Sequence, residues 1–207
     1  MKIKVCGMKY PQNIKDVLNI GIDWMGFIFY PESKRYFKGD LSGIDFKNTY
    51  KTGVFVDETI DNIEAIAHRY DLNYIQLHGN ETPGFCRELK QKSYRIIKVF
   101  KVNDTFDFKQ CEAYLPYSDL FLFDTKGKLP GGNGFSFNWS VLQNYTFDKP
   151  FLLSGGIDLS LLPSIIDFKH PKCIGVDVNS GFETAPGLKD TRQLKQFVNK
   201  IKNEIYN

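Results

Sequence analysis

The sequence has little of what marks secreted, metal-binding or membrane proteins. Its four cysteines form no C-x-x-C pair, so neither a zinc knuckle nor a disulfide framework is indicated. No stretch approaches the roughly 20 apolar residues that span a bilayer, and the first ten residues lack the apolar run of a secretory signal. We therefore expect a soluble, cytoplasmic protein with reduced thiols and no membrane association.

Charge of one sign is not concentrated anywhere in the chain. Lys and Arg number 27 and Asp and Glu number 24, which gives a net charge of +3 without a block of like charge. A nucleic-acid surface needs a basic patch, so we expect no nucleic-acid partner. The length of 207 residues predicts one domain over residues 1–207, large enough to bury a core without disulfides or metal.

Short runs of β-branched and aromatic residues recur at intervals of about 25 residues, which is too long for β-hairpins. The predicted strands are Ile3–Cys6, Trp24–Phe29, Thr52–Val56, Tyr74–Leu77, Arg95–Phe100, Leu120–Phe123, Phe151–Ser154 and Cys173–Val178.

Most of the intervals between these runs have a helical pattern, as parallel strands joined by crossovers require. Helices are predicted at Pro11–Ile20, after Thr59, from Thr82–Pro83 and from Asp190. Eight such units predict a compact, single-domain α/β fold of the (β/α)8 or TIM-barrel type, with an open doubly wound sheet as the alternative. The second helix is expected to be reduced, because residues 36–51 include two glycines and lack a sustained helical period.

In a (β/α)8 barrel the active site lies at the carboxyl ends of the strands, where this sequence has two reactive side chains. Cys6 ends the first strand, and its thiolate is a candidate nucleophile or general base if cations lower its pKa. Asp124 follows the apolar run of the sixth strand, where a carboxyl with a raised pKa is a candidate general acid. A thiolate base with a carboxylic acid suits proton relocation on a small substrate better than hydrolysis.

Glycine-rich turns follow the sixth, seventh and eighth strands, at residues 131–134, 154–156 and 179–181. The last two positions are where many barrels bind phosphate through backbone amides, so a phosphate site is predicted there; tight turns alone are the alternative. Arg35, in the loop after the second strand, is a candidate for binding a carboxylate. His78 and Asp177 end the fourth and eighth strands, and the sequence leaves open whether they contact substrate. The three histidines are dispersed over separate units, and no metal site is predicted.

These strand ends carry an ordered series of motifs that resembles the phosphoribosylanthranilate isomerase family. The match runs from residue 3 to about residue 195 and is specific because the motifs occur in order. The motifs are KVCGMK (4–9), GFIFYPESKRY (26–36), GVFVDE (53–58), IQLHGNE (75–81), FDTKGKLPGGNGFSFNW (123–139), LLSGGI (152–157) and GVDVNSGFETAPGLKD (175–190).

The resemblance implies a step of tryptophan biosynthesis, the Amadori rearrangement of N-(5-phosphoribosyl)anthranilate to 1-(o-carboxyphenylamino)-1-deoxyribulose 5-phosphate. It implies a phosphorylated small-molecule substrate carrying an anthranilate group, no cofactor, and a monomer or homodimer. By the family's motifs, Cys6 is the general base and Asp124 the general acid, and Arg35 lies near the anthranilate carboxylate. The implied phosphate contacts are Gly155, Gly156, Asn179, Ser180 and Gly181. Asn179 and Asn133 stand where family members usually have Ser or Thr.

Three other functions are weighed against this one. The histidine-pathway isomerase runs similar chemistry with an aspartate at the end of the first strand, where this chain has Cys6. Indole-glycerol phosphate synthase would be expected to have a catalytic lysine and glutamates in its early strands. A catalytically silent anion-binding barrel would keep the glycine turns and lose the acid or base, whereas this chain has both Cys6 and Asp124.

Overall fold

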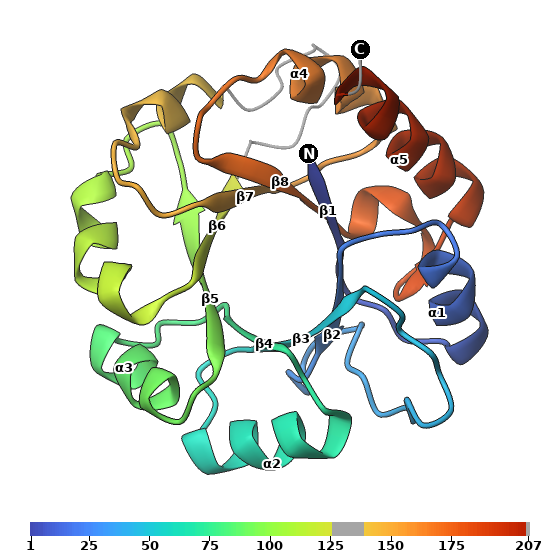
Figure 1. Ribbon diagram of the computed structural model, residues 1–207, viewed down its shortest axis with the longest axis horizontal. Coiled ribbons are helices and arrows are strands. Elements are labelled where there is room, and N and C mark those ends of the chain that lie inside the picture. The colour runs from blue at the N-terminus through green and yellow to red at the C-terminus, as the bar shows by residue number, and fades with distance from the viewer. Residues whose placement is uncertain (126–138, 206–207) are drawn as a thin grey trace.

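Eight parallel strands form a closed barrel in the computed structural model, which describes residues 1–125 and 139–205 (Figure 1). Each strand pairs with its neighbours in sequence, and β8 closes the ring against β1. The predicted (β/α)8 barrel is therefore confirmed, and the open sheet is excluded. The strands are β1 (Lys2–Val5), β2 (Trp24–Ile28), β3 (Tyr50–Phe55), β4 (Tyr74–Leu77), β5 (Arg95–Val102), β6 (Leu120–Thr125), β7 (Phe151–Ser154) and β8 (Cys173–Val178).

Alternation along each strand divides the apolar side chains into an inner and an outer set. The inner set is one buried cluster that fills the barrel and consists of Trp24, Ile97, Val99, Leu120, Leu122 and Leu152. Because Asp124 continues the alternation of Leu120 and Leu122, its side chain belongs to the inner face at the end of β6.

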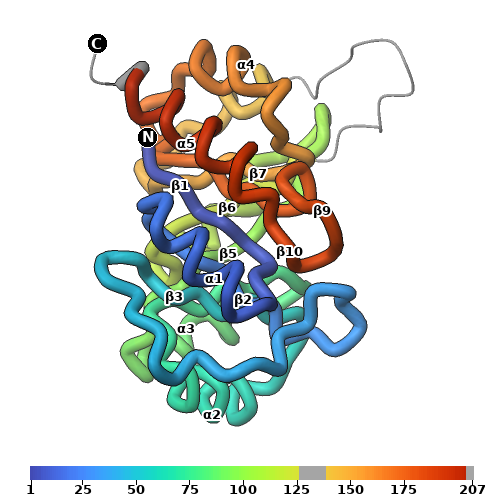
Figure 2. The backbone as a smooth tube through the Cα atoms, turned by 90° about the vertical axis from the view of Figure 1, so that its right-hand side faces the viewer, coloured from blue at the N-terminus to red at the C-terminus, as the bar shows by residue number. Residues whose placement is uncertain are grey.

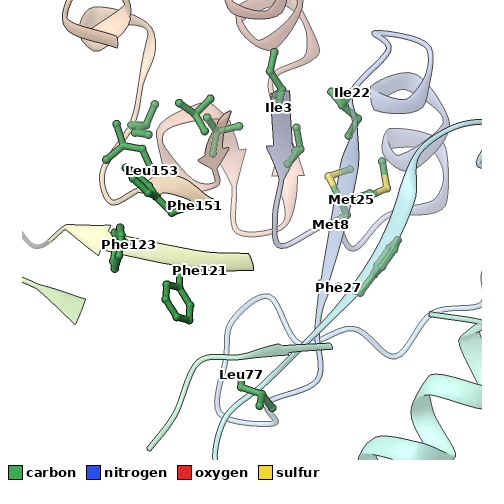
Figure 3. Close-up of a cluster of buried hydrophobic side chains, with 14 of the residues drawn as sticks. Ile3, Met8, Ile22, Met25, Phe27, Leu77, Phe121, Phe123, Phe151 and Leu153 are labelled. Atoms are coloured by element: carbon green, nitrogen blue, oxygen red, sulfur yellow. The ribbon is translucent and has the colours of Figure 1, made fainter. Parts of the chain in front are cut away.

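The outer set packs between the strands and the surrounding helices. Phe121 and Phe123 of β6 lie beside Phe151 and Leu153 of β7 in this layer (Figure 3). The rings of Phe123 and Phe151 are 4.9 Å apart between centroids. Burying so many aromatic rings stabilises the barrel wall, at about 25 cal/mol per Å² of apolar surface removed from water.

Four helices follow the sequence signals closely. They are α1 (Pro11–Leu18), α2 (Ile60–Tyr70), α3 (Pro83–Gln91) and α5 (Thr191–Ile205). Thr59 and Thr82 cap α2 and α3 by accepting hydrogen bonds from the amides of Asn62 and Phe85. Asp190 caps α5 by accepting hydrogen bonds from the amides of Arg192 and Gln193, and the helix begins at the next residue, Thr191, as the sequence predicted.

The other helical positions of the barrel are shorter than in a full (β/α)8 fold. Residues 29–49, all of which the structure describes, contain no helix, which confirms the predicted reduction. The reduction extends further than predicted: α4 (Leu162–Asp167) has six residues, and η1 (Phe108–Tyr117) and η2 (Trp139–Asn144) are 310 helices. Pro116 lies inside η1, and proline removes a backbone donor that an α-helix would use.

After β8 the chain forms a short excursion before it enters α5. A 310 turn, η4 (Ser180–Phe182), leads into the antiparallel pair β9 (Glu183–Ala185) and β10 (Leu188–Lys189). Earlier in the chain, between β7 and α4, lies another 310 turn, η3 (Leu159–Leu161). Figure 2 shows β9 and β10 in a loop near the end of β2. No helix within residues 1–125 and 139–205 is long and apolar enough to cross a membrane.

Candidate active site

A polar cavity lies at the carboxyl ends of the barrel strands. It is lined by side chains that continue the inner alternation of β1, β4, β6, β7 and β8, and by the turns after β7 and β8. The lining residues are Cys6, Ile28, Val54, Gln76, His78, Asp124, Ser154, Gly155, Gly156, Ile157, Asp177, Asn179, Ser180 and Gly181. All but one of the predicted site residues therefore share this cavity, and the exception is Arg35.

Cys6 is buried at the base of the cavity, next to a buried ion pair. Lys4 precedes it by two residues on β1, and its ammonium is 2.7 Å from Asp177 Oδ1, because β1 and β8 pair with Lys4 opposite Asp177. Burial raises the pKa of the Cys6 thiol and Asp177 raises it further, while Lys4 and Lys189 act to lower it. The Lys4 pKa is itself raised, because Asp177 and the Cys6 sulfur together outweigh the burial that would lower it.

The side chains of Asp124 and His78 lie next to each other in the wall of the cavity. His78 Nε2 is 3.4 Å from Asp124 Oδ2, and both side chains remain partly exposed, at 30% and 23%. Gln76, which precedes His78 on the inner face of β4, has its Nε2 atom 3.4 Å from His78 Nδ1. Its Oε1 atom is buried with no hydrogen-bond partner among the described residues. The carboxyl is thus accessible from the cavity and has an imidazole beside it.

The turns after β7 and β8 bring backbone amides to the cavity wall. Gly155 and Gly156 have φ values of 106° and 61°, which favour glycine. A Cβ atom at Gly181 would lie 2.2 Å from the carbonyl oxygen of Ile157, so the two turns are packed against each other. The amides of Gly155, Gly156, Ser180 and Gly181 are not donors in any of the backbone hydrogen bonds that the described residues form in turns, loops and caps. These donors are suited to binding an anion.

Arg35 lies at the rim and is held by an acidic side chain that the sequence did not single out. Its Nε and Nη2 atoms donate to the Glu183 carboxylate at 2.6 to 3.0 Å. Glu183 also accepts from Lys189 Nζ at 2.6 Å, and Lys189 donates to Asn179 Oδ1 at 2.7 Å. Asn179, in place of the expected serine, thus connects the turn after β8 to this network.

Sequence reasoning missed four polar residues that organise the site: Lys4, Gln76, Glu183 and Lys189. Lys4 and Gln76 each precede a predicted site residue by two positions on a strand, so strand alternation placed them on the same inner face. That signal was available for both. The positions of Glu183 and Lys189 depend on the pairing of β9 with β10 at the rim of the barrel, which no local pattern predicts. The predicted turn at residues 131–134, including Asn133, lies outside the described residues.

The chemical groups of the cavity indicate what kind of site it is. Within the described part of the chain, no group of three or more His, Cys, Asp or Glu side chains is arranged to hold a metal ion. What the cavity does contain is a thiol, a carboxyl, an imidazole and the glycine-rich turns after β7 and β8. A closed (β/α)8 barrel with such groups at the carboxyl ends of its strands defines a TIM-barrel enzyme whose site is equipped for proton transfer.

Comparison with known proteins identifies the family. The profile described as N-(5'phosphoribosyl)anthranilate (PRA) isomerase matches residues 3–200. An N-(5'-phosphoribosyl)anthranilate isomerase from Phocaeicola vulgatus is 45% identical over 205 residues, covering 99% of this chain and 100% of the relative. One from Parabacteroides distasonis is 44% identical over 206 residues, covering 97% and 93%. The chain belongs to the N-(5'-phosphoribosyl)anthranilate isomerase family, as its motifs predicted.

Solved structures agree in fold. Phosphoribosyl anthranilate isomerase from Thermotoga maritima superposes with a TM-score of 0.86 at 32% identity, covering 98% of this chain and 99% of that one. A second phosphoribosyl anthranilate isomerase structure is a complex with reduced 1-(o-carboxyphenylamino)-1-deoxyribulose 5-phosphate. It has a TM-score of 0.84 at 31% identity, with 98% and 99% coverage. Both are TIM barrels that match essentially the whole chain.

Proposed function

We propose that the protein catalyses the Amadori rearrangement of N-(5-phosphoribosyl)anthranilate to 1-(o-carboxyphenylamino)-1-deoxyribulose 5-phosphate, a step of tryptophan biosynthesis. The observation that carries the proposal is that Cys6 and Asp124 line one cavity from strands three places apart in the barrel. This separation gives a base and an acid room to act on different atoms of one small sugar. The ligand of the related complex is the reduced form of the proposed product.

Asp124 begins the reaction as the general acid. Its proton passes to the furanose ring oxygen as the bond from that oxygen to C1 breaks, and the anthranilate nitrogen supplies the electron pair that forms the Schiff base. The partly exposed position of Asp124 on the cavity wall supports this role, because a general acid must reach the substrate. His78, at 3.4 Å, orients the carboxyl and stabilises the carboxylate that is left.

Cys6 completes the rearrangement as the general base. Its thiolate takes the proton from the ribose C2 atom, and the electron pair released moves into the C1–C2 bond to give an enolamine. Tautomerisation to the ketone then yields the product, so that only protons are moved and no redox cofactor is required. The burial of Cys6 at the base of the cavity supports this role, because a desolvated thiolate is a stronger base.

The two ends of the substrate are assigned to two parts of the site. The phosphate binds at the turns after β7 and β8, through the amides of Gly155, Gly156, Ser180 and Gly181. The anthranilate carboxylate binds at the rim, where Arg35 has a guanidinium edge beyond the two nitrogens held by Glu183. Asp177 lines the cavity and forms hydrogen bonds with Lys4 and Ser154, so we assign it to organising the site through these two side chains.

Anthranilate fluorescence tests the proposal. The purified protein should quench the fluorescence of N-(5-phosphoribosyl)anthranilate as product forms, and Asp124→Asn and Cys6→Ala should each lower turnover by at least about a hundredfold, the usual effect of removing a positioned acid or base. If both variants kept nearly the full rate, the assignment of acid and base would be wrong. Substrate binding without turnover by the unaltered protein would favour the silent anion-binding barrel.

A further inference from the structure

Lys4 is a buried charged group inside the barrel, and the proposed reaction has no direct use for it. Lys4 is fully buried inside the barrel, where its side chain has an exposed fraction of 0%. It is not among the residues that line the cavity, so the proposed steps at Asp124 and Cys6 do not use it. A buried ammonium is costly unless it is paired and serves a purpose, so its position needs explanation.

Backbone register places Lys4 between an acid and the thiol. Lys4 pairs with Asp177 across β1 and β8, and Cys6 follows two residues later on the same inner face of β1. On the other side of β1, a Cβ atom at Gly26 of β2 would lie 2.8 Å from Cys6 Sγ and 3.2 Å from Lys4 Nζ. The sulfur and the ammonium are therefore within about 6 Å of each other, in a space that the glycine leaves open.

We propose that Lys4 is a positioning residue that stabilises the Cys6 thiolate from beneath, while Asp177 fixes its ammonium beside the sulfur. The proposal rests on the assigned role of Cys6 as the base. In effect, the ion pair presents the positive end of a fixed dipole to the sulfur. The Asp177 carboxylate, 2.7 Å from Lys4 Nζ, keeps the ammonium charged inside the barrel.

The other charged groups around Cys6 are consistent with this arrangement. Lys189 of β10 lowers the pKa of the Cys6 thiol, but less than Lys4 does, and Asp177 of β8 raises it. Arg35 from the loop after β2 also interacts electrostatically with the sulfur. Asp124 and His78 line the same cavity from the far strands. Lys4 is the cation with the largest effect on the sulfur.

Other cysteines show what burial does in the absence of such a cation. At Cys111, burial and the Asp107 carboxylate raise the pKa to about 12. A thiol with that pKa is almost entirely protonated at neutral pH and is a poor base. A base at Cys6 requires a compensating positive charge, and Lys4 supplies it from a position that the substrate does not occupy.

The test is a titration of the Cys6 thiol by the ultraviolet absorbance of its thiolate. Each protein is compared with the same protein carrying Cys6→Ser, so that the difference isolates Cys6. In Lys4→Met the titration should shift upward by at least about one pH unit, which is a tenfold lower thiolate fraction at neutral pH. The readout does not require catalysis, so it remains informative if Cys6 is not the base.

The double variant Lys4→Met, Asp177→Asn makes the test decisive, because it removes the ion pair as a neutral unit and avoids a lone buried carboxylate. Its Cys6 titration should lie between those of the unaltered protein and Lys4→Met. A titration equal to that of the unaltered protein would show that Lys4 only neutralises Asp177, and the proposal would be overturned. Lys4→Arg keeps the positive charge, so its Cys6 titration should lie close to that of the unaltered protein.

Lys98→Met is the matched control. Lys98 is also buried and paired, at 2.7 Å from Glu81, but it lies on the outer side of β5 and is not among the charged groups that shift the pKa of the Cys6 thiol. This variant should lose stability as Lys4→Met does and leave the Cys6 titration unchanged. A shifted Cys6 titration in Lys98→Met would mean that loosening the barrel alone explains the result. If Lys4→Met shifts the titration while Cys6→Ala keeps full turnover, the assignment of Cys6 as the base fails and the effect of Lys4 on the thiol stands.

Discussion

The Arg35 guanidinium and the Glu183 carboxylate form a two-point ion pair that joins the loop after β2 to the short strand β9. The shortest contact, from Nη2 to Oε2, is 2.6 Å, and the Glu183 side chain is only 5% exposed. Glu183 is also paired with the fully buried Lys189. The orientation of Arg35 at the rim is therefore set by residues nearly 150 positions further along the chain.

Glu183→Gln should weaken substrate binding more than it slows the chemical step. Glutamine can accept one hydrogen bond from Arg35 but cannot form the charged two-point pair, so the guanidinium loses its fixed orientation at the proposed site for the anthranilate carboxylate. We expect KM to rise about tenfold, which corresponds to roughly 1.4 kcal/mol of a charge-assisted interaction, with kcat changed less than threefold or so. Steady-state kinetics by anthranilate fluorescence measure both values.

A double-variant cycle with Arg35→Ala checks the cause. If Glu183 acts through Arg35, the effect of the two changes together on KM should be clearly smaller than the product of their separate effects. Independent effects would show that Glu183 influences binding by another route. A large loss of kcat with KM unchanged in Arg35→Ala would contradict the assignment of Arg35 to the anthranilate carboxylate.

The same ion pairs predict how stability depends on acid. Burial acts to raise the Glu183 pKa, but hydrogen bonds from Arg35 and Lys189 outweigh it, and the folded-state pKa is lowered. A lowered pKa means that the carboxylate stabilises the fold above the unfolded-state value of about 4.3 and that this contribution is lost as pH falls through the folded-state pKa. Urea unfolding at several pH values should show it.

Glu183→Gln provides the comparison for the acid measurement. At neutral pH it should lower the free energy of unfolding by about 1 to 3 kcal/mol, because Lys189 is left buried beside a neutral amide. Below the folded-state pKa of Glu183 the difference between the two proteins should shrink, since the unaltered carboxyl is then protonated as well. A difference that stays constant with pH would rule out ionisation of Glu183 as its source.

The parts of the molecule that the sequence predicted are those governed by local rules. Strand alternation and capping residues such as Thr59 and Thr82 located the barrel elements, and the strand ends located the cavity with Cys6 and Asp124. Lys4 was missed although the same alternation placed it beneath Cys6, because a lysine inside a barrel contradicts the usual preference for apolar interiors.

The parts of the site that the sequence did not predict depend on contacts between residues far apart in the chain. Glu183 meets Arg35 only because β9 and β10 pack beside α1 at the rim of the barrel, and Asp177 meets Lys4 only through the closure of β8 on β1. Neither contact leaves a periodic trace in the chain. The conversion of the fifth and sixth helical positions to 310 helices was also missed, because it depends on packing against the barrel as well as on local residues such as Pro116.

Gly26→Ala should damage the site without unfolding the barrel. The added Cβ would lie 2.8 Å from Cys6 Sγ, which is closer than Cβ atoms approach in proteins, and a tight 3.1 Å from Cys6 Cα, so Cys6 must move. We expect turnover to fall at least tenfold or so and the free energy of unfolding to fall by about 1 to 3 kcal/mol, as in overpacked cores. Kinetics and urea unfolding give the two values.

Gly84→Ala is the control for this steric effect. Gly84 lies in the first turn of α3, and a Cβ there would meet its nearest atom at 3.7 Å, an ordinary contact. The helix should gain up to about 1 kcal/mol and turnover should be unchanged. Unchanged turnover in Gly26→Ala would indicate that the position of the Cys6 sulfur is not critical, which would count against its role as the base.

The pH dependence of kcat/KM should report the Cys6 thiol. Burial raises the pKa of this thiol above its usual value, and a general base acts only when deprotonated, so the thiolate fraction grows as pH increases toward that pKa. We therefore expect kcat/KM to rise with pH between about pH 6 and pH 8 in the unaltered protein. Cys6→Asp replaces the thiol by a group with a lower intrinsic pKa of about 3.9, so its rising limb should move to lower pH even if the maximum rate falls. A rising limb at the same pH in both proteins would assign it to a group other than Cys6.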